Sequence, residues 1–189
     1  MSDVRARLKD KKRIVVKIGS SSLMYADTGL LNIGKVEKLT RILADLRNAG
    51  NDVCLVSSGA ISTGRNSLTT NNNSNTLSFK QACAAIGQAK LIAHYQRFFA
   101  EYSINTAQVL LTEIILADEE SRVNALNTFN ELFKLGAIPV VNENDSISTE
   151  EIKYVHTFGD NDRLSAIVAK LVDADLLVIL SDIDGMYTD

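Results

Sequence analysis

The chain of 189 residues is long enough to bury one substantial core, and 46% hydrophobic with 23% charged residues is typical of a globular domain. A net charge of -3 and only 6% aromatic residues exclude a basic, base-stacking nucleic-acid surface, and no apolar run of about 18 residues predicts a membrane span. Cys54 and Cys83 have neither metal-binding nor redox spacing, so we expect buried thiols in a cytoplasmic protein.

The N-terminal part of the chain begins with a basic arm, residues 1–12, which lacks the apolar segment of a targeting signal. The β-branched run Arg13–Ile18 predicts a buried strand. Apolar residues at spacings of three and four then predict a helix over 32–49, with Asn32 as its N-cap and Gly50 as its stop.

Strands and helices continue to alternate along the rest of the chain. Strands are predicted at 52–56, 106–111, 137–141 and 176–180, and helices at 78–102, as one helix or two, and at 121–136. The face of 78–102 expected to be buried holds Phe79, Cys83, Ile86, Phe98 and Tyr102. Residues 69–75 are polar and of low complexity, which predicts a poorly ordered loop. The alternation predicts an α/β fold, an open and mostly parallel sheet with helices on both faces.

Small or polar residues directly follow four of the predicted strands. The segments are KIGSSS, SSGA, NEND and SDIDG. Because the carboxyl ends of parallel strands share one edge, these segments should meet in one crevice. The longest polar stretch, 142–162, supplies most candidates for holding a small polar ligand: Asn142, Asn144, Asp145, Asp160, Asn161 and Asp162.

The residue types in this crevice favour phosphoryl transfer. Lys17 and the backbone N–H groups of 19–22 suit phosphate oxygens. Arg65 and Asn66 stand where a P-loop needs lysine and a hydroxyl, which excludes that motif. With no nucleophile–base pair, a reaction that needs positioning and charge neutralisation fits best. Asp182 fits either a turn around Gly185 or a site.

Seven segments in this order resemble the glutamate 5-kinase branch of the amino acid kinase family. They are VVKIGSSSL, LVSSGAISTGR, AAIGQAKLI, QVLLT, IPVVNENDSISTEEI, FGDNDRLSAIVA and LLVILSDIDGMYTD, and they cover essentially the whole chain after the arm. The combination of NEND, GDND, SSGAI and AAIGQ marks this branch. The resemblance implies the α/β/α sandwich of that family.

The resemblance also implies a reaction and its residues. The reaction is transfer of the γ-phosphate of ATP, with Mg2+, to the side-chain carboxylate of L-glutamate, the first step of proline biosynthesis. Lys17 is implied to stabilise the transferring phosphoryl group and Asp162 to orient catalytic lysines. The implied glutamate-binding residues are Ser58, Asp145 and Asn161. The implied nucleotide- and phosphate-binding residues are Lys17, Gly19, Ser20, Gly59, Ser181 and Asp182, and no protein metal ligand is assigned.

By the same resemblance, residues 13–165 form the glutamate-binding lobe and 166–189 begin a nucleotide-binding lobe that is incomplete. We therefore expect weak or no turnover by this chain alone. The alternatives are a non-catalytic glutamate-binding fragment and an amino acid kinase with a different carboxylate substrate. Feedback inhibition by proline and assembly into a homo-oligomer are expectations of the resemblance alone. The expectation of no nucleic-acid and no membrane partner comes from the composition instead.

Overall fold

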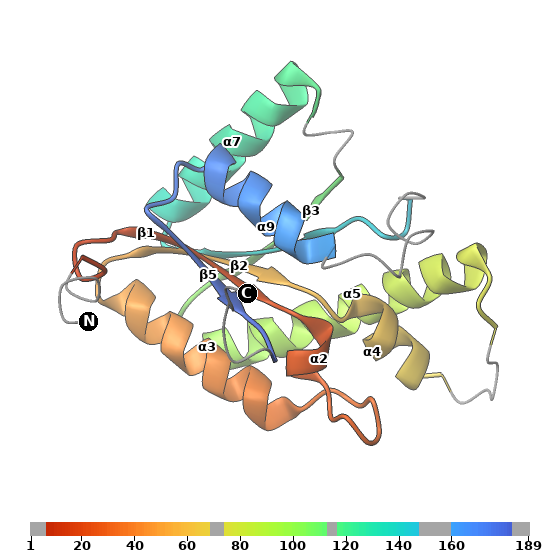
Figure 1. Cartoon of the computed structure of the whole chain (residues 1–189). Coiled ribbons are helices and arrows are strands. Elements are labelled where there is room, and N and C mark those ends of the chain that lie inside the picture. The colour runs from red at the N-terminus through yellow and green to blue at the C-terminus, as the bar shows by residue number, and fades with distance from the viewer. Residues whose placement is uncertain (1–6, 69–73, 113–116, 148–159, 183–189) are drawn as a thin grey trace, which may run out of the picture.

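The computed structural model describes residues 7–68, 74–112, 117–147 and 160–182. Parts of four predicted segments lie outside the described residues: the basic arm, the polar loop at 69–75, the stretch 142–162 and the segment 166–189. The strands are β1 (Arg13–Ile18), β2 (Asp52–Ser57), β3 (Thr106–Leu111), β4 (Ile138–Glu143) and β5 (Leu176–Leu180). They form one sheet in the order β3-β4-β2-β1-β5, and every pair is parallel, which confirms the predicted parallel sheet (Figure 1).

Helices cover both faces of this sheet (Figure 1). The long helices are α3 (Ile33–Asn48) and α5 (Leu77–Ala100) on one face, and α7 (Glu119–Lys134) and α9 (Asp160–Leu171) on the other. Two short helices, α2 (Ser20–Leu23) and α4 (Ala60–Asn66), directly follow β1 and β2. The layers are therefore those of an α/β/α sandwich.

Alternate residues of each central strand enter different cores. Val16 packs with α3 and α5, whereas Val15 and Cys54 pack with α7 and α9. Side chains of a strand alternate between faces, so two cores require strands that are apolar at nearly every position. Both cysteines are fully buried thiols, as predicted.

The residues predicted to begin and end α3 are confirmed. The side chain of Asn32 accepts a hydrogen bond from the backbone N–H of Lys35 at 3.0 Å, and Gly50 has a φ of +87°, the left-handed conformation that ends helices. Pro139 is the second residue of β4, ahead of the first pairing of β4 with β2, where a missing N–H leaves the ladder intact.

The predicted buried face of the long helix was wrong in part. Residues 77–100 form one helix, but Ile86 is exposed, and Phe79, Phe98 and Tyr102 are only partly buried. The buried residues instead follow a neighbouring stripe: Cys83, Ala84, Gly87, Gln88, Leu91, Tyr95 and Phe99. The first part of this stripe, 83–87, holds small residues because it lies against the backbone of α4, which leaves no room for a large side chain. The large residues further along, Leu91, Tyr95 and Phe99, pack into the core.

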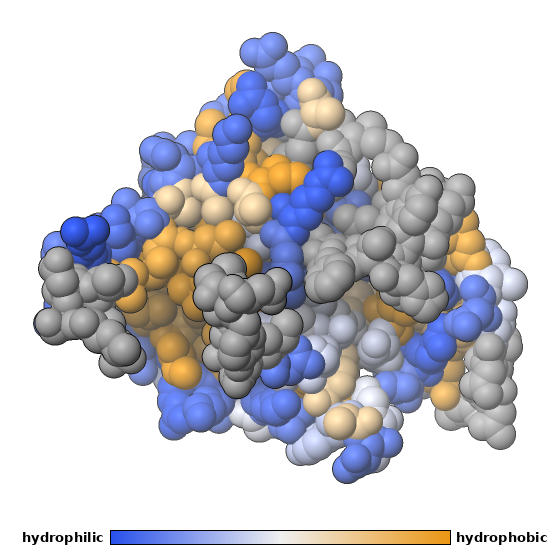
Figure 2. All heavy atoms as spheres, in the orientation of Figure 1, coloured by the Kyte–Doolittle hydropathy of each residue, from blue (hydrophilic) through white to orange (hydrophobic). Residues whose placement is uncertain are grey.

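The strand β5 lies at one edge of the sheet and is less covered than its neighbours. Its residues are partly buried and Ile179 is exposed. Figure 2 shows hydrophobic side chains gathered on the viewer's side between α3 and α9, over this edge of the sheet. Among the described helices, none is both long enough and apolar enough to cross a membrane.

Candidate functional site

A cleft of about 1250 Å³ opens at the carboxyl ends of the strands. The residues that line it come from the ends of β1, β4 and β5, the segment after β2, and the starts of α2, α4 and α9. The ten residues to which the family resemblance gave a role all line this cleft: Lys17, Gly19, Ser20, Ser58, Gly59, Asp145, Asn161, Asp162, Ser181 and Asp182. Of the other candidates in 142–162, Asn142 also lines the cleft, Asn144 lines a separate hollow of about 260 Å³, and the side chain of Asp160 lies outside the described part of the chain. The structure thus brings together residues that lie up to 165 positions apart (Lys17 to Asp182), because the parallel strands end at one edge.

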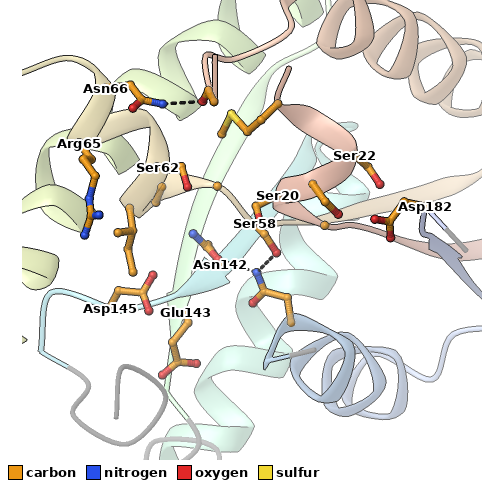
Figure 3. A pocket seen from close by; sticks show the side chains of 18 of the residues that line it. Ser20, Ser22, Ser58, Ser62, Arg65, Asn66, Asn142, Glu143, Asp145 and Asp182 are labelled. Atoms are coloured by element: carbon orange, nitrogen blue, oxygen red, sulfur yellow. Dashed lines mark hydrogen bonds between the residues drawn. The ribbon is translucent and has the colours of Figure 1, made fainter. Parts of the chain in front are cut away.

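Figure 3 shows the two ends of the cleft. Ser20, Ser22 and Asp182 lie at one end, and Arg65, Asn66 and Asp145 lie at the other. Ser58 and Asn142 lie between them. One end is therefore formed by the segments after β1 and β5, and the other by α4 and the segment after β4.

Lys17 is a nearly buried cation in the wall of the cleft, and an ion pair holds it in place. Lys17 shares a strand face with Val15, the face that α9 covers, and its Nζ lies 2.6 Å from Oδ1 of Asp162 in the first turn of α9. The lysine side chain is 9% exposed and the aspartate side chain 47%. A Cβ on Gly19 would lie 3.4 Å from the Lys17 Nζ, so the backbone at Gly19 passes close to the ammonium group. The result is a fixed positive charge at the cleft wall.

A chain of side-chain amides crosses the middle of the site. The Asn142 Nδ2 donates to Oε1 of Gln88 at 2.8 Å, and the Asn161 Nδ2 donates to Oδ1 of Asn142 at 3.2 Å and also to Oγ of Ser58. Gln88, Asn142 and Asn161 are each less than a tenth exposed. Buried polar groups are stabilised when they are paired in this way, and the chain joins α5, β4, α9 and the segment after β2.

The glycine before α4 shapes the wall beside Ser58. Gly59 is the N-cap residue of α4 and has a φ of +104°, which only glycine adopts readily. The Ser58 N–H donates to the carbonyl oxygen of Ile18 at 3.1 Å, which ties this segment to the end of β1. The backbone at Ser58 therefore lies beside the end of β1, and α4 begins directly after Gly59.

The remaining predicted residues reach the cleft from loops and element ends. Ser20 is the first residue of α2, and Asp145 lies in the turn after β4. Ser181 and Asp182 follow β5, with the serine Oγ 3.4 Å from Oδ1 of the aspartate. Their position in the cleft is an observation, whereas their roles stay predictions.

Two residues of the amide chain received no role from the sequence. Asn142 was a candidate by composition only, and Gln88 was part of the AAIGQ segment that carried the family resemblance. No sequence signal singles out Gln88, because its rotation toward the sheet depends on how α5 packs. The further residues that line the cleft without a predicted role include Arg65, Asn75, Lys80 and Glu143.

The described residues contain no group of three acidic, histidine or cysteine side chains that could hold a metal ion by themselves. The cleft does hold carboxylates, among them Asp162 in the first turn of α9 and Asp182 after β5. Mg2+ commonly binds through one or two carboxylates together with substrate phosphates and water. The donor set therefore fits a magnesium ion that arrives with a nucleotide.

The chain matches the amino acid kinase family over residues 12–189. It is 52% identical over 184 residues to the glutamate 5-kinase of Clostridium perfringens, an alignment that covers 97% of this chain and 68% of that protein. It is 52% identical over 185 residues to the glutamate 5-kinase of Carboxydothermus hydrogenoformans, covering 98% and 49% respectively. It is also 48% identical over 186 residues to the glutamate 5-kinase of Enterococcus faecalis, covering 98% and 68%. The chain thus spans from about half to about two thirds of the length of these curated relatives.

Among solved structures, the UMP kinase from Ureaplasma parvum has a similar fold. The TM-score is 0.60 at 15% sequence identity, and the match covers 94% of this chain and 72% of that one. At this identity the likeness shows the fold alone, which agrees with the α/β/α sandwich predicted above.

Proposed function

The chain belongs to the amino acid kinase family, in its glutamate 5-kinase branch, and we propose that the protein transfers the γ-phosphate of ATP to the side-chain carboxylate of L-glutamate. The observation that carries the proposal is the buried ammonium of Lys17, paired with Asp162, in the same cleft as the Ser58–Asn161–Asn142 amide chain and Asp145. A charge-neutralising cation and a polar site for a small zwitterion are the two parts that this reaction needs. The product is glutamyl 5-phosphate, the first intermediate of proline biosynthesis.

The end of the cleft near Asp145 suits the amino acid. A carboxylate only accepts hydrogen bonds when ionised, so Asp145 fits the α-ammonium group of glutamate. Ser58 and Asn161 each offer a donor and an acceptor in the same cleft, and their mutual hydrogen bond fixes both groups before a ligand arrives. We assign these three residues to glutamate binding.

The end near Ser20 and Asp182 suits the nucleotide. Gly19, Ser20 and Gly59 would line the path of the phosphates with backbone N–H groups and a hydroxyl, and Ser181 and Asp182 would belong to the nucleotide site. When bound with the nucleotide, Mg2+ would neutralise phosphate charge, and Asp162 and Asp182 are the carboxylates that would hold it.

In the transfer itself, an oxygen of the glutamate side-chain carboxylate forms a bond to the γ-phosphorus. The bond from that phosphorus to the bridging oxygen of ADP breaks, and ADP leaves with the electron pair. The Lys17 ammonium stabilises the negative charge that spreads over the phosphoryl oxygens, and Asp162 orients that ammonium. No proton transfer is needed, because the acceptor is already a carboxylate.

We place the protein in the cytoplasm and expect a homo-oligomer whose glutamate site also responds to proline. These statements follow from the family assignment.

Calorimetric titration of the purified chain with L-glutamate tests the proposal. We expect saturable binding that weakens about tenfold or more in Asp145→Asn, since a hydrogen bond to a charged group contributes roughly 1.5–3 kcal/mol. Asp45→Asn, on the exposed surface of α3, removes the same charge away from the cleft and should bind like the unmodified chain. A folded chain that does not bind L-glutamate would contradict the substrate assignment. Steady glutamate-dependent release of ADP by this chain would favour the kinase over a glutamate-binding fragment and would contradict the expectation of weak or no turnover.

A further inference from the structure

The geometry points to Gln88 as a positioning residue, which orients the glutamate-binding side chains through Asn142 without touching the substrate. This inference rests on the proposed function for its ligand. Gln88 lies on α5, beneath the cleft, and its Oε1 accepts the 2.8 Å hydrogen bond from Asn142. It belongs to neither the charge pair nor the set of residues assigned to glutamate.

The hydrogen bond to Gln88 determines which way the Asn142 amide faces. A side-chain amide donates from its nitrogen and accepts at its oxygen. Because the Asn142 Nδ2 donates to Gln88, the Asn142 Oδ1 points the other way and accepts from the Asn161 Nδ2. If Asn142 turned over, its nitrogen would meet the nitrogen of Asn161, two donors with no acceptor between them.

The orientation of the Asn142 amide in turn affects Asn161 and Ser58, two of the residues assigned to glutamate binding. The Asn161 Nδ2 is shared between Asn142 and the Ser58 Oγ, so the position of Asn142 sets that of Asn161 and, through it, the hydroxyl of Ser58. Gln88 is 8% exposed and Asn142 2% exposed. The Asn142 amide would therefore lose a buried hydrogen bond if Gln88 lost its oxygen.

The packing of α5 against α4 fixes the position of Gln88 relative to α4. A Cβ on the preceding residue, Gly87, would lie 1.7 Å from the carbonyl oxygen of Ala60, and a Cβ on Gly64 would lie 1.9 Å from the carbonyl oxygen of Cys83. The two helices therefore meet backbone to backbone. Since α4 starts directly after Ser58 and Gly59, this contact fixes Gln88 relative to the wall that it orients.

A second polar contact from the same helix face supports this view of α5. Tyr95 is seven residues, or about two turns, after Gln88, and its hydroxyl lies 2.8 Å from the Ser57 Oγ. Both of these hydroxyl-bearing residues are fully buried. The face of α5 toward the sheet thus contacts the ends of both β2 and β4 through hydrogen bonds, which an apolar stripe would not do.

The test compares Gln88→Met with Gln88→Glu. Methionine keeps an unbranched chain of similar length but removes the acceptor oxygen, whereas glutamate keeps an oxygen in the same place. We expect L-glutamate affinity to fall at least about tenfold in Gln88→Met and to recover to within about threefold in Gln88→Glu. Thr40→Val is the matched control, because it removes a buried hydrogen bond on α3, from the Thr40 hydroxyl to the carbonyl of Val36, far from the amide chain.

A double-mutant comparison shows whether Gln88 acts through Asn142. In an Asn142→Ala background, Gln88→Met should cost no further affinity, because the residue that carries the effect is gone. An equal loss in both backgrounds would overturn the inference. So would a Gln88→Met chain that binds L-glutamate like the unmodified one.

A readout without ligand separates this inference from the proposed function. The side-chain amide NMR signals of Asn142 and Asn161 should shift in Gln88→Met, return in Gln88→Glu and stay unchanged in Thr40→Val. If the unmodified chain binds no L-glutamate but the signals behave in this way, the substrate assignment fails and the positioning role stands. Unchanged signals in Gln88→Met would refute the positioning role whatever the ligand. If Gln88→Met does not fold, Gln88→Ala takes its place in both measurements.

Discussion

The pair of Lys17 and Asp162 is the clearest functional contact at the scale of single residues. The ammonium is nearly buried and lies 2.6 Å from a carboxylate that is about half exposed. Loss of the carboxylate would leave the Lys17 ammonium buried without a counter-charge, which is destabilising. Water around the half-exposed Asp162 screens the attraction, so the pair contributes less to stability than a fully buried pair would. The contact should therefore contribute measurably to folding as well as to catalysis.

We predict that Asp162→Asn lowers the free energy of unfolding by about 1 kcal/mol, because the Lys17 ammonium then lacks its counter-charge in a place with little water. Urea denaturation with an unchanged slope measures the loss. The control is Glu131→Gln, which breaks the ion pair of Glu131 with Lys134 on the exposed surface of α7 and should change stability by less than about 0.5 kcal/mol. Equal midpoints for the two variants would show that the pair in the cleft contributes nothing to folding.

At the scale of elements, the contact between α4 and α5 positions α4, whose first residues line the cleft. The backbones of the two helices approach so closely that Gly64 and Gly87 have no room for a Cβ. Overpacking of a tight contact usually costs about 1–3 kcal/mol, and here the clash is with backbone, which cannot rotate away. Glycine at these two positions lowers the intrinsic stability of each helix, but it allows the two helices to pack closely.

We predict that Gly64→Ala destabilises the chain by at least about 2 kcal/mol and lowers L-glutamate affinity as well, because moving α4 shifts Ser58. Gly34→Ala in α3 is the control. Its Cβ would meet only Asn32 Oδ1 at 3.5 Å, an ordinary contact, so the change should stabilise by about 0.5–1 kcal/mol. Thermal unfolding of both variants gives the comparison, and a Gly64→Ala chain as stable as Gly34→Ala would contradict the close approach.

The sequence predicts local features and strand ends well, but it does not predict the close contact between α4 and α5. Glycines and polar residues directly after the strands were sufficient to predict the cleft, because the carboxyl ends of parallel strands lie along one edge of the sheet. The helix ends at Asn32 and Gly50 were predictable because capping is local chemistry. Ile86 was expected inside and Gln88 was given no role, since the rotation of α5 follows from backbone contact with α4, a long-range effect that periodicity does not report.

At the scale of the whole molecule, each face of the sheet buries an ionisable group that must stay neutral. Cys54 lies in the core under α7 and α9, and Tyr95 in the core under α3 and α5. Burial raises the pKa of the Cys54 thiol far above its ordinary value, and burial also raises the pKa of the Tyr95 hydroxyl, against a smaller lowering by the hydrogen bond with Ser57. Both cores should therefore lose stability in alkaline solution.

The direction follows from proton binding. Above the ordinary thiol pKa, which is near 9, the unfolded chain releases the Cys54 proton and the folded chain keeps it. The contribution of this thiol to stability is thus fully present below that pKa, and it falls by about 1.4 kcal/mol for each further pH unit. The Tyr95 hydroxyl adds the same trend above its ordinary pKa of 10.0.

We predict that Cys54→Ala flattens the alkaline loss of stability relative to the unmodified chain. Between about pH 9.5 and pH 10.5 the difference in slope should approach 1.4 kcal/mol per pH unit, and below about pH 8 the two curves should run parallel. Tyr95→Phe should flatten the curve only above about pH 10, the ordinary value for tyrosine. Urea midpoints measured across this range in the presence of a reducing agent give the curves. If the Cys54→Ala curve stays parallel to that of the unmodified chain at every pH, the thiol does not have to remain protonated in the folded state.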